Sequence, residues 1–183
     1  MKKILRALIC LFLIASTQAI AEDNIADKAI NEQRVSKIAV YGSAQSNKVV
    51  TDKTVLGEEA KRITTKGTGN NWDAAAQSVT TGKIKAGDEI ICLVFLKAVE
   101  TANNAPAKVA LQLQQSSEPY TAEKREEMNI GKDWSQYQIT LTASKDYGRG
   151  EAAFVVQMNY GAQTIDVGPM FILNMAKTTK GSR

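Results

Sequence analysis

The sequence predicts an all-β fold, a β-sandwich. Three segments alternate apolar and polar residues with the period of two that a half-buried strand requires, namely Ala107–Ser116, Trp134–Ala143 and Ala152–Tyr160. Between expected strands lie turn sequences rich in Gly, Asn and Asp, such as Lys66–Asn71 and Lys85–Asp88. Almost no segment has helical periodicity. Roughly eight or nine strands separated by turns are typical of a sandwich.

The first part of the chain resembles an export signal rather than a piece of the fold. Basic residues precede an apolar run at Ala7–Ala15, which is too short for the roughly 20 residues that span a bilayer. Ala19–Ala21 fits the small-x-small cleavage pattern, so we expect a signal peptide at 1–21 and a mature chain from Glu22. This predicts a secreted or periplasmic protein.

After the signal we expect a lead-in at 22–34, either a short helix or disordered, then one sandwich domain at 35–176 and a polar tail at 177–183. The segment Glu89–Val99 is apolar on both parities, which predicts a central strand covered on both faces. The expected strands, in order, are Val35–Ala44, Lys48–Leu56, Ala60–Thr65, Trp72–Val79, Glu89–Val99, Ala107–Ser116, Trp134–Ala143, Ala152–Tyr160 and Thr164–Met175.

Charge and composition exclude several functions. The whole chain has 183 residues, 23 basic and 19 acidic. Removing the leader's three basic residues leaves a net charge of +1, too weak for nucleic-acid binding. The absence of His removes imidazole bases and His metal ligands. After cleavage one cysteine remains, Cys92, so no intrachain disulfide can form, and its apolar strand predicts a buried, inert thiol. No second run approaches membrane length.

Three stretches in a fixed order carry a pattern known from other proteins. They are Val55–Ile63 ahead of Asn71–Asp73, then Ile84–Asp88 leading into Leu93–Ala98, then Asp133–Tyr137 with Asp146–Tyr147 and Thr164–Pro169. Together they resemble carbohydrate-binding modules of the galactose-binding-like jelly-roll type, which are attached to xylanases and related glycan hydrolases. The resemblance spans about 120 residues, from Val49 to Leu173, a length typical of one domain.

The resemblance implies a jelly roll of two facing antiparallel sheets, with sugar bound on a concave sheet face or at the loop end and no bond broken. Two features depart from the pattern. The usual Asn-Gly-Phe-Glu opening is missing near Val40–Gly42, which weakens the case for a bound calcium. The usual pair of acids before the last strand is reduced to Asp166.

Sugars require aromatic rings for their C–H faces and side chains that both donate and accept hydrogen bonds. Gln112, Gln114, Gln157 and Asn159 occupy the polar parity of two strands and would form a row of amides if both strands share a sheet. An ordinary solvent-facing sheet would show the same alternation. Trp72, beside three alanines, suits a stacking platform, although a core tryptophan opposite small residues is the somewhat favoured interpretation.

Other aromatic and acidic residues have weaker patterns. Tyr120 and Tyr160 could edge a binding groove or be pinned to the sandwich rim. Trp134 and Tyr137 are interpreted as structural. Asp166 could bind calcium, although a role in accepting backbone N–H bonds at a strand end is favoured. The run Glu123–Glu127 is interpreted as a solvated stretch, since adjacent carboxylates on a strand point to opposite faces and cannot form a glycosidase pair.

The sequence therefore predicts an exported, non-catalytic protein that binds a neutral β-linked polysaccharide by aromatic stacking and amide hydrogen bonds. No cofactor is expected beyond a possible structural calcium. The alternative is a periplasmic or surface module that binds another protein, such as a glycan-degrading enzyme, with the same sandwich. An enzyme is disfavoured, because no pair of converging carboxylates is evident.

Overall fold

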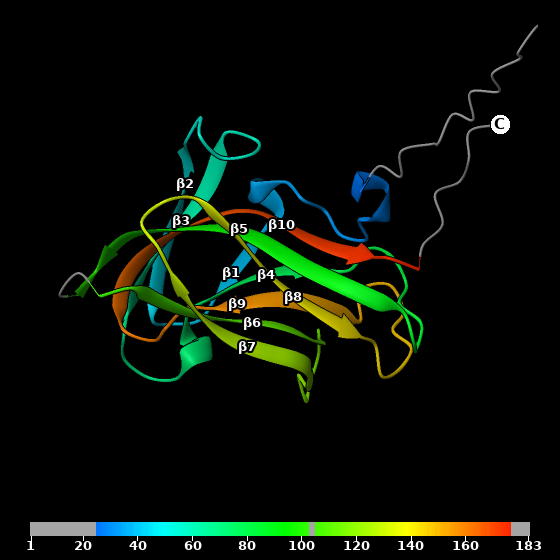
Figure 1. Cartoon of the computed structure of the whole chain (residues 1–183). Helices are drawn as coiled ribbons and strands as arrows, with labels where there is room; N and C mark the ends of the chain where they lie inside the picture. Colours follow the sequence, from blue (N-terminus) through cyan, green and yellow to red (C-terminus); the bar gives the residue numbers. More distant parts are fainter. Residues whose placement is uncertain (1–24, 103–104, 177–183) are drawn as a thin grey trace, which may run out of the picture.

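The computed structural model describes residues 25–102 and 105–176, and it confirms the all-β jelly-roll sandwich (Figure 1). Two five-stranded antiparallel sheets face each other, ordered β1-β4-β9-β6-β7 and β2-β3-β10-β5-β8. The strands are β1 (Ala39–Tyr41), β2 (Gln45–Thr51), β3 (Glu59–Lys66), β4 (Ala75–Val79), β5 (Glu89–Thr101), β6 (Ala107–Gln115), β7 (Ala122–Ile130), β8 (Ser135–Thr142), β9 (Ala152–Gln157) and β10 (Ala162–Asn174). The predicted signal, residues 22–24 and the tail at 177–183 lie outside the described residues. Within the described part, no helix is long and apolar enough to cross a membrane.

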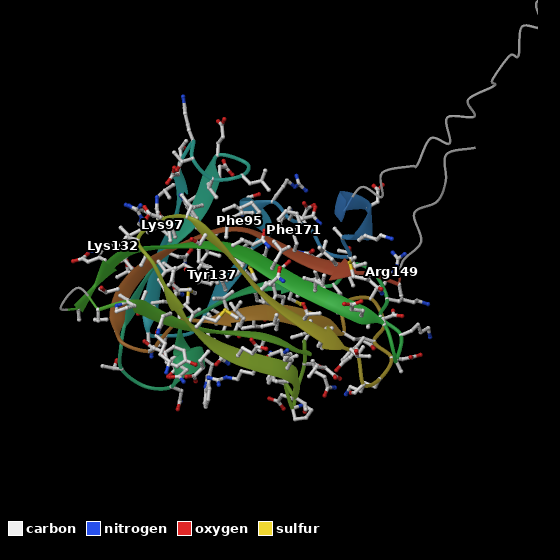
Figure 2. All side chains as sticks on the ribbon, viewed as in Figure 1. Phe95, Lys97, Lys132, Tyr137, Arg149 and Phe171 are labelled. Atoms are coloured by element: carbon white, nitrogen blue, oxygen red, sulfur yellow. The ribbon has the colours of Figure 1, made fainter. Side chains whose placement is uncertain are left out.

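The core fills the space between the sheets with one parity of each strand. Leu111 and Phe154 from the first sheet meet Ile90 and Ile165 from the second, all without exposed surface. Burying a side chain of this size contributes about 1.5–3 kcal/mol. Cys92 lies in the same core, and burial raises the pKa of its thiol, as expected for an inert cysteine. Tyr137 packs against this core from β8, which confirms its structural assignment (Figure 2).

One strand was missed in the sequence. The charged run Glu123–Glu127, expected to be a solvated stretch, forms most of β7 at the edge of the first sheet. Edge strands tolerate charge because one side of the strand remains in solvent. Lys124 uses that position to reach across the sandwich, and its Nζ donates to the carbonyl of Thr140 in the other sheet at 2.8 Å. Glu126 pairs with Lys124 at 2.7 Å.

Strand β9 is buried on both faces, unlike the apolar β5. All six residues of β9 are buried, whereas the outward side chains of β5, such as Leu93 and Phe95, are half-buried on the outer face of the second sheet (Figure 2). Strand β9 is the third of five in its sheet, and the sandwich core covers one side of it. Its other face carries Ala153 and Val155, against which Tyr41 packs, and the side chain of Gln157.

The segment before the first strand seals one edge of the sandwich. A 3-10 turn at Ile25–Lys28 is followed by Asn31, only 5% exposed, which bonds to both sheets. Its Nδ2 donates to Ser78 Oγ in β4 at 2.7 Å and to the carbonyl of Met170 in β10 at 2.9 Å, and its Oδ1 accepts the amide of Ile172 at 2.8 Å. The expected strand Val35–Ala44 is shorter than predicted, since a 3-10 turn occupies Val35–Lys37.

Asp166 holds a buried ion pair. Both oxygens of this fully buried carboxylate accept from Arg62, at 2.7 and 2.8 Å, and Lys97 lies 3.9 Å away. The oxygens are thus engaged by a cation of the protein, which argues against the calcium ligand that the sequence allowed. The partner of Asp166, which lies within β10, is the side chain of Arg62 rather than the backbone N–H groups at a strand end that the sequence favoured. The described residues hold no cluster of three or more acidic or Cys side chains suited to a metal.

The indole of Trp134 lies next to Lys97, the second cation near Asp166. Its Nε1 donates to Asp52 at 2.9 Å, and the Nζ of Lys97 lies 4.8 Å from the ring centre. Lys97 also forms an ion pair with Asp52. The hydrogen bond from Lys97 is the largest cause, and that from Trp134 a smaller one, that holds the pKa of Asp52 well below its usual range. Trp134 is therefore structural, as predicted.

Replacing Asn31 tests the seal between the sheets. Asn31→Ala leaves a buried carbonyl and a buried amide of β10 without partners, so we expect the free energy of unfolding to fall by about 2–4 kcal/mol in urea titrations. Lys37→Ala, at an exposed position of the same segment, should change it by less than about 0.5 kcal/mol. Equal stability of Asn31→Ala and the wild type would contradict the assigned role.

Candidate functional site

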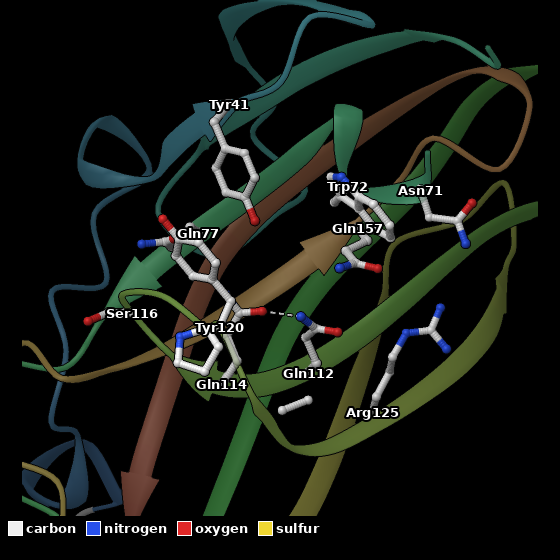
Figure 3. A pocket seen from close by; sticks show the side chains of 12 residues that line it. Tyr41, Asn71, Trp72, Gln77, Gln112, Gln114, Ser116, Tyr120, Arg125 and Gln157 are labelled. Carbon is white, nitrogen blue, oxygen red and sulfur yellow. Dashed lines mark hydrogen bonds between the residues drawn. The ribbon is translucent and has the colours of Figure 1, made fainter. Parts of the chain in front are cut away.

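A groove of about 900 Å³ opens on the outer face of the first sheet, away from the core. Figure 3 shows aromatic rings around a group of amide side chains, with one arginine at the side. Of the twelve lining residues only Arg125 is charged, and none is a carboxylate. The lining residues are Tyr41, Asn71, Trp72, Gln77, Gln112, Gln114, Ser116, Pro119, Tyr120, Ala122, Arg125 and Gln157.

The floor of the groove follows from strand register. Gln157 of β9 lies between Ala75 of β4 and Ala110 of β6, so one row across the sheet is an amide flanked by alanines. In the next row Val155 lies between Gln77 and Gln112. Side chains in register on one face of a sheet are neighbours. Small residues alternate with amides, which hollows the floor and leaves the amides as its polar groups.

The floor amides are partly paired with each other. The Nε2 of Gln112 donates to the Oε1 of Gln114 (Figure 3). Within the described residues, the Oε1 of Gln112, the Nε2 of Gln114 and both side-chain polar atoms of Gln157 make no further hydrogen bond, and none of them is sealed from the groove. Either orientation of the Gln112–Gln114 pair leaves one donor and one acceptor facing the groove. A molecule carrying hydroxyl groups can satisfy both.

Trp72 stands at one end of the groove, and 55% of its surface is exposed, so it is not the core tryptophan that the sequence also allowed. It lies in a 3-10 turn at Asn71–Asp73 rather than in the strand that was expected there. The turn is capped at its start, where the Oδ2 of Asp73 accepts the amide of Asn70 at 2.8 Å. The ring is thus presented on an ordered segment.

Asn159 does not line the groove, contrary to the expected row of four amides. The chain leaves β9 at Gln157, and Asn159 turns inward to 3% exposure. There its Nδ2 donates to the carbonyls of Thr68 and Asn70, at 2.6 and 2.9 Å, and its Oδ1 accepts the amide of Gly67 at 2.9 Å. Asn159 therefore fixes the loop that carries Trp72.

Tyr120 stands on the loop between β6 and β7, and 52% of its surface is exposed. Its φ of 54° lies in the left-handed region, which costs a side-chain-bearing residue about 1–2 kcal/mol. The turn that holds it is closed by its own amide, which donates to the carbonyl of Ser117 at 2.8 Å. Residues with such strained backbone angles are found most often at functional sites.

Tyr160 lies behind the groove wall rather than in the lining. Its hydroxyl accepts a hydrogen bond from the Nη2 of Arg125 and donates one to Glu127 at 3.1 Å. Burial, followed by the effect of Glu127, raises the pKa of this phenol to about 12, so the hydroxyl stays protonated. Tyr160 therefore positions Arg125 and does not itself form the groove surface.

The structure brings together five of the predicted residues, Trp72, Gln112, Gln114, Gln157 and Tyr120, and adds others. Tyr41 and Gln77 were missed because β1 and β4 are short and carry no clear alternation. Arg125 was missed because its strand was not recognised. The burial of Tyr41 against the alanines of the floor, followed by the nearby Tyr120, raises the pKa of its hydroxyl.

Comparisons with solved structures agree with the fold. A structure titled "CBM4 structure and function" matches with a TM-score of 0.58 and 15% identity, over 76% of this chain and 95% of that one. The CBM22-1 xylan-binding domain of Paenibacillus barcinonensis Xyn10C matches with a TM-score of 0.55 and 12% identity, over 83% and 94%. The CBM22-1-GH10 modules of Clostridium thermocellum xylanase 10B, complexed with xylohexaose, match with a TM-score of 0.57 and 13% identity, over 84% and 28%. At such identities these likenesses establish the fold alone.

Sequence comparison gives the family. No curated protein sequence matches the chain. A family model described as a carbohydrate binding domain, CBM_4_9, matches residues 28–162. This range includes all five strands of the first sheet, on which the groove lies, and ends where β10 of the second sheet begins. The chain therefore belongs to this family of carbohydrate-binding domains.

Proposed function

We propose that this protein is exported and binds, without cleaving it, a β-linked polysaccharide with a neutral backbone along the groove of the first sheet. The observation that carries the proposal is the set of unpaired amide atoms between two exposed aromatic rings, Trp72 and Tyr120. The rings would pack on the apolar faces of sugar units. The amides of Gln112, Gln114 and Gln157 would donate to and accept from hydroxyl groups.

Two features support binding without hydrolysis. Glycosidases need a pair of carboxyl groups about 5–10 Å apart across the scissile bond, and none of the groove's lining residues is acidic. The lining instead offers amides, hydroxyls and aromatic rings.

Export is supported by the signal-like pattern of residues 1–21. Xylan is the first glycan to test, because similar structures include a xylan-binding domain.

The proposal is tested by pull-down on insoluble xylan, cellulose and related glycans, followed by calorimetry on oligosaccharides. We expect saturable binding to at least one β-linked glycan, with a stoichiometry of one site per chain. Absence of binding across the whole panel would overturn the proposal. Stoichiometric co-purification of a protein partner that survives Trp72→Ala would favour the interaction module instead.

Removing the Trp72 ring tests aromatic stacking. Trp72→Ala should weaken binding of the best oligosaccharide about five- to tenfold by calorimetry, because a stacked ring contributes about 1 kcal/mol. The free energy of unfolding should change little, because the ring is largely exposed. Leu56→Ala is the matched control, because Leu56 is 57% exposed and lies outside the groove lining. Equal loss in both variants would argue against stacking.

A substitution at Tyr120 should change the affinity for the oligosaccharide without a large change in the free energy of unfolding. Tyr120→Gly relieves left-handed strain but adds freedom to the unfolded chain, so the free energy of unfolding should stay within about 1 kcal/mol. Affinity for the oligosaccharide should nevertheless fall several-fold. Glu58→Gly changes a residue with φ 58° outside the groove and should leave affinity intact. Unaltered affinity in Tyr120→Gly would remove this ring from the site.

A further inference from the structure

The groove carries one charge, and the charge is positive. Arg125 is on β7, in register with Gln112 of β6, so its side chain belongs to the same face as the floor amides. Figure 3 shows its guanidinium directed toward Asn71, at the side of the groove where Trp72 stands. No acidic residue lines the groove to balance it.

The partners of Arg125 compensate its charge only in part. Its Nη2 donates to Glu127 at 2.8 Å and to the hydroxyl of Tyr160. Glu127 is shared, because Lys108 reaches its other oxygen at 2.6 Å. One carboxylate between two cations leaves a local charge of +1. Lys108, and then Arg125, lower the pKa of Glu127 to about 2, so this carboxylate stays ionised at neutral pH.

The donors of Arg125 are also not exhausted. A guanidinium has five N–H groups in a planar fork. Within the described residues, only the Nη2 of Arg125 has partners, so its Nε–H and both Nη1–H groups are free. Two anchors, Glu127 and Tyr160, fix the plane of the fork, which removes much of the entropy that a free arginine loses on binding.

We propose that the groove selects a glycan whose neutral backbone carries a uronic acid substituent, and that Arg125 receives the carboxylate of this substituent while the backbone follows the amides and rings. The inference rests on the proposed function and narrows its ligand class. A fixed guanidinium with free donors and a net charge of +1 matches a single anion on an otherwise uncharged chain. The surrounding amides match the hydroxyl groups.

The test uses calorimetry at low salt with xylo-oligosaccharides of equal backbone length, with and without one glucuronic acid substituent. We expect the wild type to bind the acidic ligand about two- to fivefold more tightly, as for one partly exposed ion pair. The preference should shrink at high salt. Arg125→Gln should remove it while retaining affinity for the neutral ligand, and Arg125→Lys should retain part of it. Lys48→Gln, which removes an equal charge from β2 in the other sheet, should leave it unchanged.

The outcomes separate this inference from the function on which it rests. Equal affinity for both ligands in the wild type, or a preference that persists in Arg125→Gln, would overturn the role of Arg125 and leave glycan binding standing. Failure to bind any glycan would overturn the proposed function itself. Tighter binding of a sulfated oligosaccharide than of the uronic acid ligand would assign Arg125 to sulfate esters and contradict the choice of carboxylate.

Discussion

The register between β9 and β6 is the constraint on which the groove depends. Because side chains alternate along a strand, pairing Gln112 with Val155 places Phe154 and Leu111 in the core and Gln112, Gln114 and Gln157 together on the opposite face. A slip by one residue would send the amides into the core and the phenylalanine into solvent. The core therefore enforces the arrangement of the binding face, because any other pairing would expose buried apolar side chains such as Leu113 and Val156.

The surrounding loops depend on this face in turn. Asn159 follows β9 directly and bonds to the loop that carries Trp72, so the position of the ring is tied to the end of a strand buried on both sides. Tyr120 follows β6 and is held in a tight turn. Tyr160 ties Arg125 to the same region. The groove is thus built on rigid strands, with short connections that set its walls.

The sequence was sufficient where alternation was strong. The strands that carry Gln112 and Gln157 alternate clearly, and the amides they share in one groove were predicted from that pattern. The prediction failed where hydrogen bonds to nearby backbone groups, rather than strand alternation, decide where a side chain points. Asn159 has the parity of the amides, yet the carbonyls of Thr68 and Asn70 bind it inward. In the charged strand β7, only Met128 and Ile130, near its end, contact the core. The strand therefore lacks an apolar alternation, and neither the strand nor the role of Arg125 was predicted. A short strand such as β1, which positions Tyr41, offers too few residues for periodicity.

The central claim is that the outer face of β9 and β6 contacts the glycan. It is tested most directly by NMR, following the side-chain amide signals of glutamine as a β-linked oligosaccharide from the binding panel is added. The structure predicts that the signals of Gln112, Gln114 and Gln157 shift together with the indole of Trp72, while Gln136 and Gln138 on the outer face of β8 remain unchanged. Shifts confined to Gln136 and Gln138, with the groove amides silent, would contradict it.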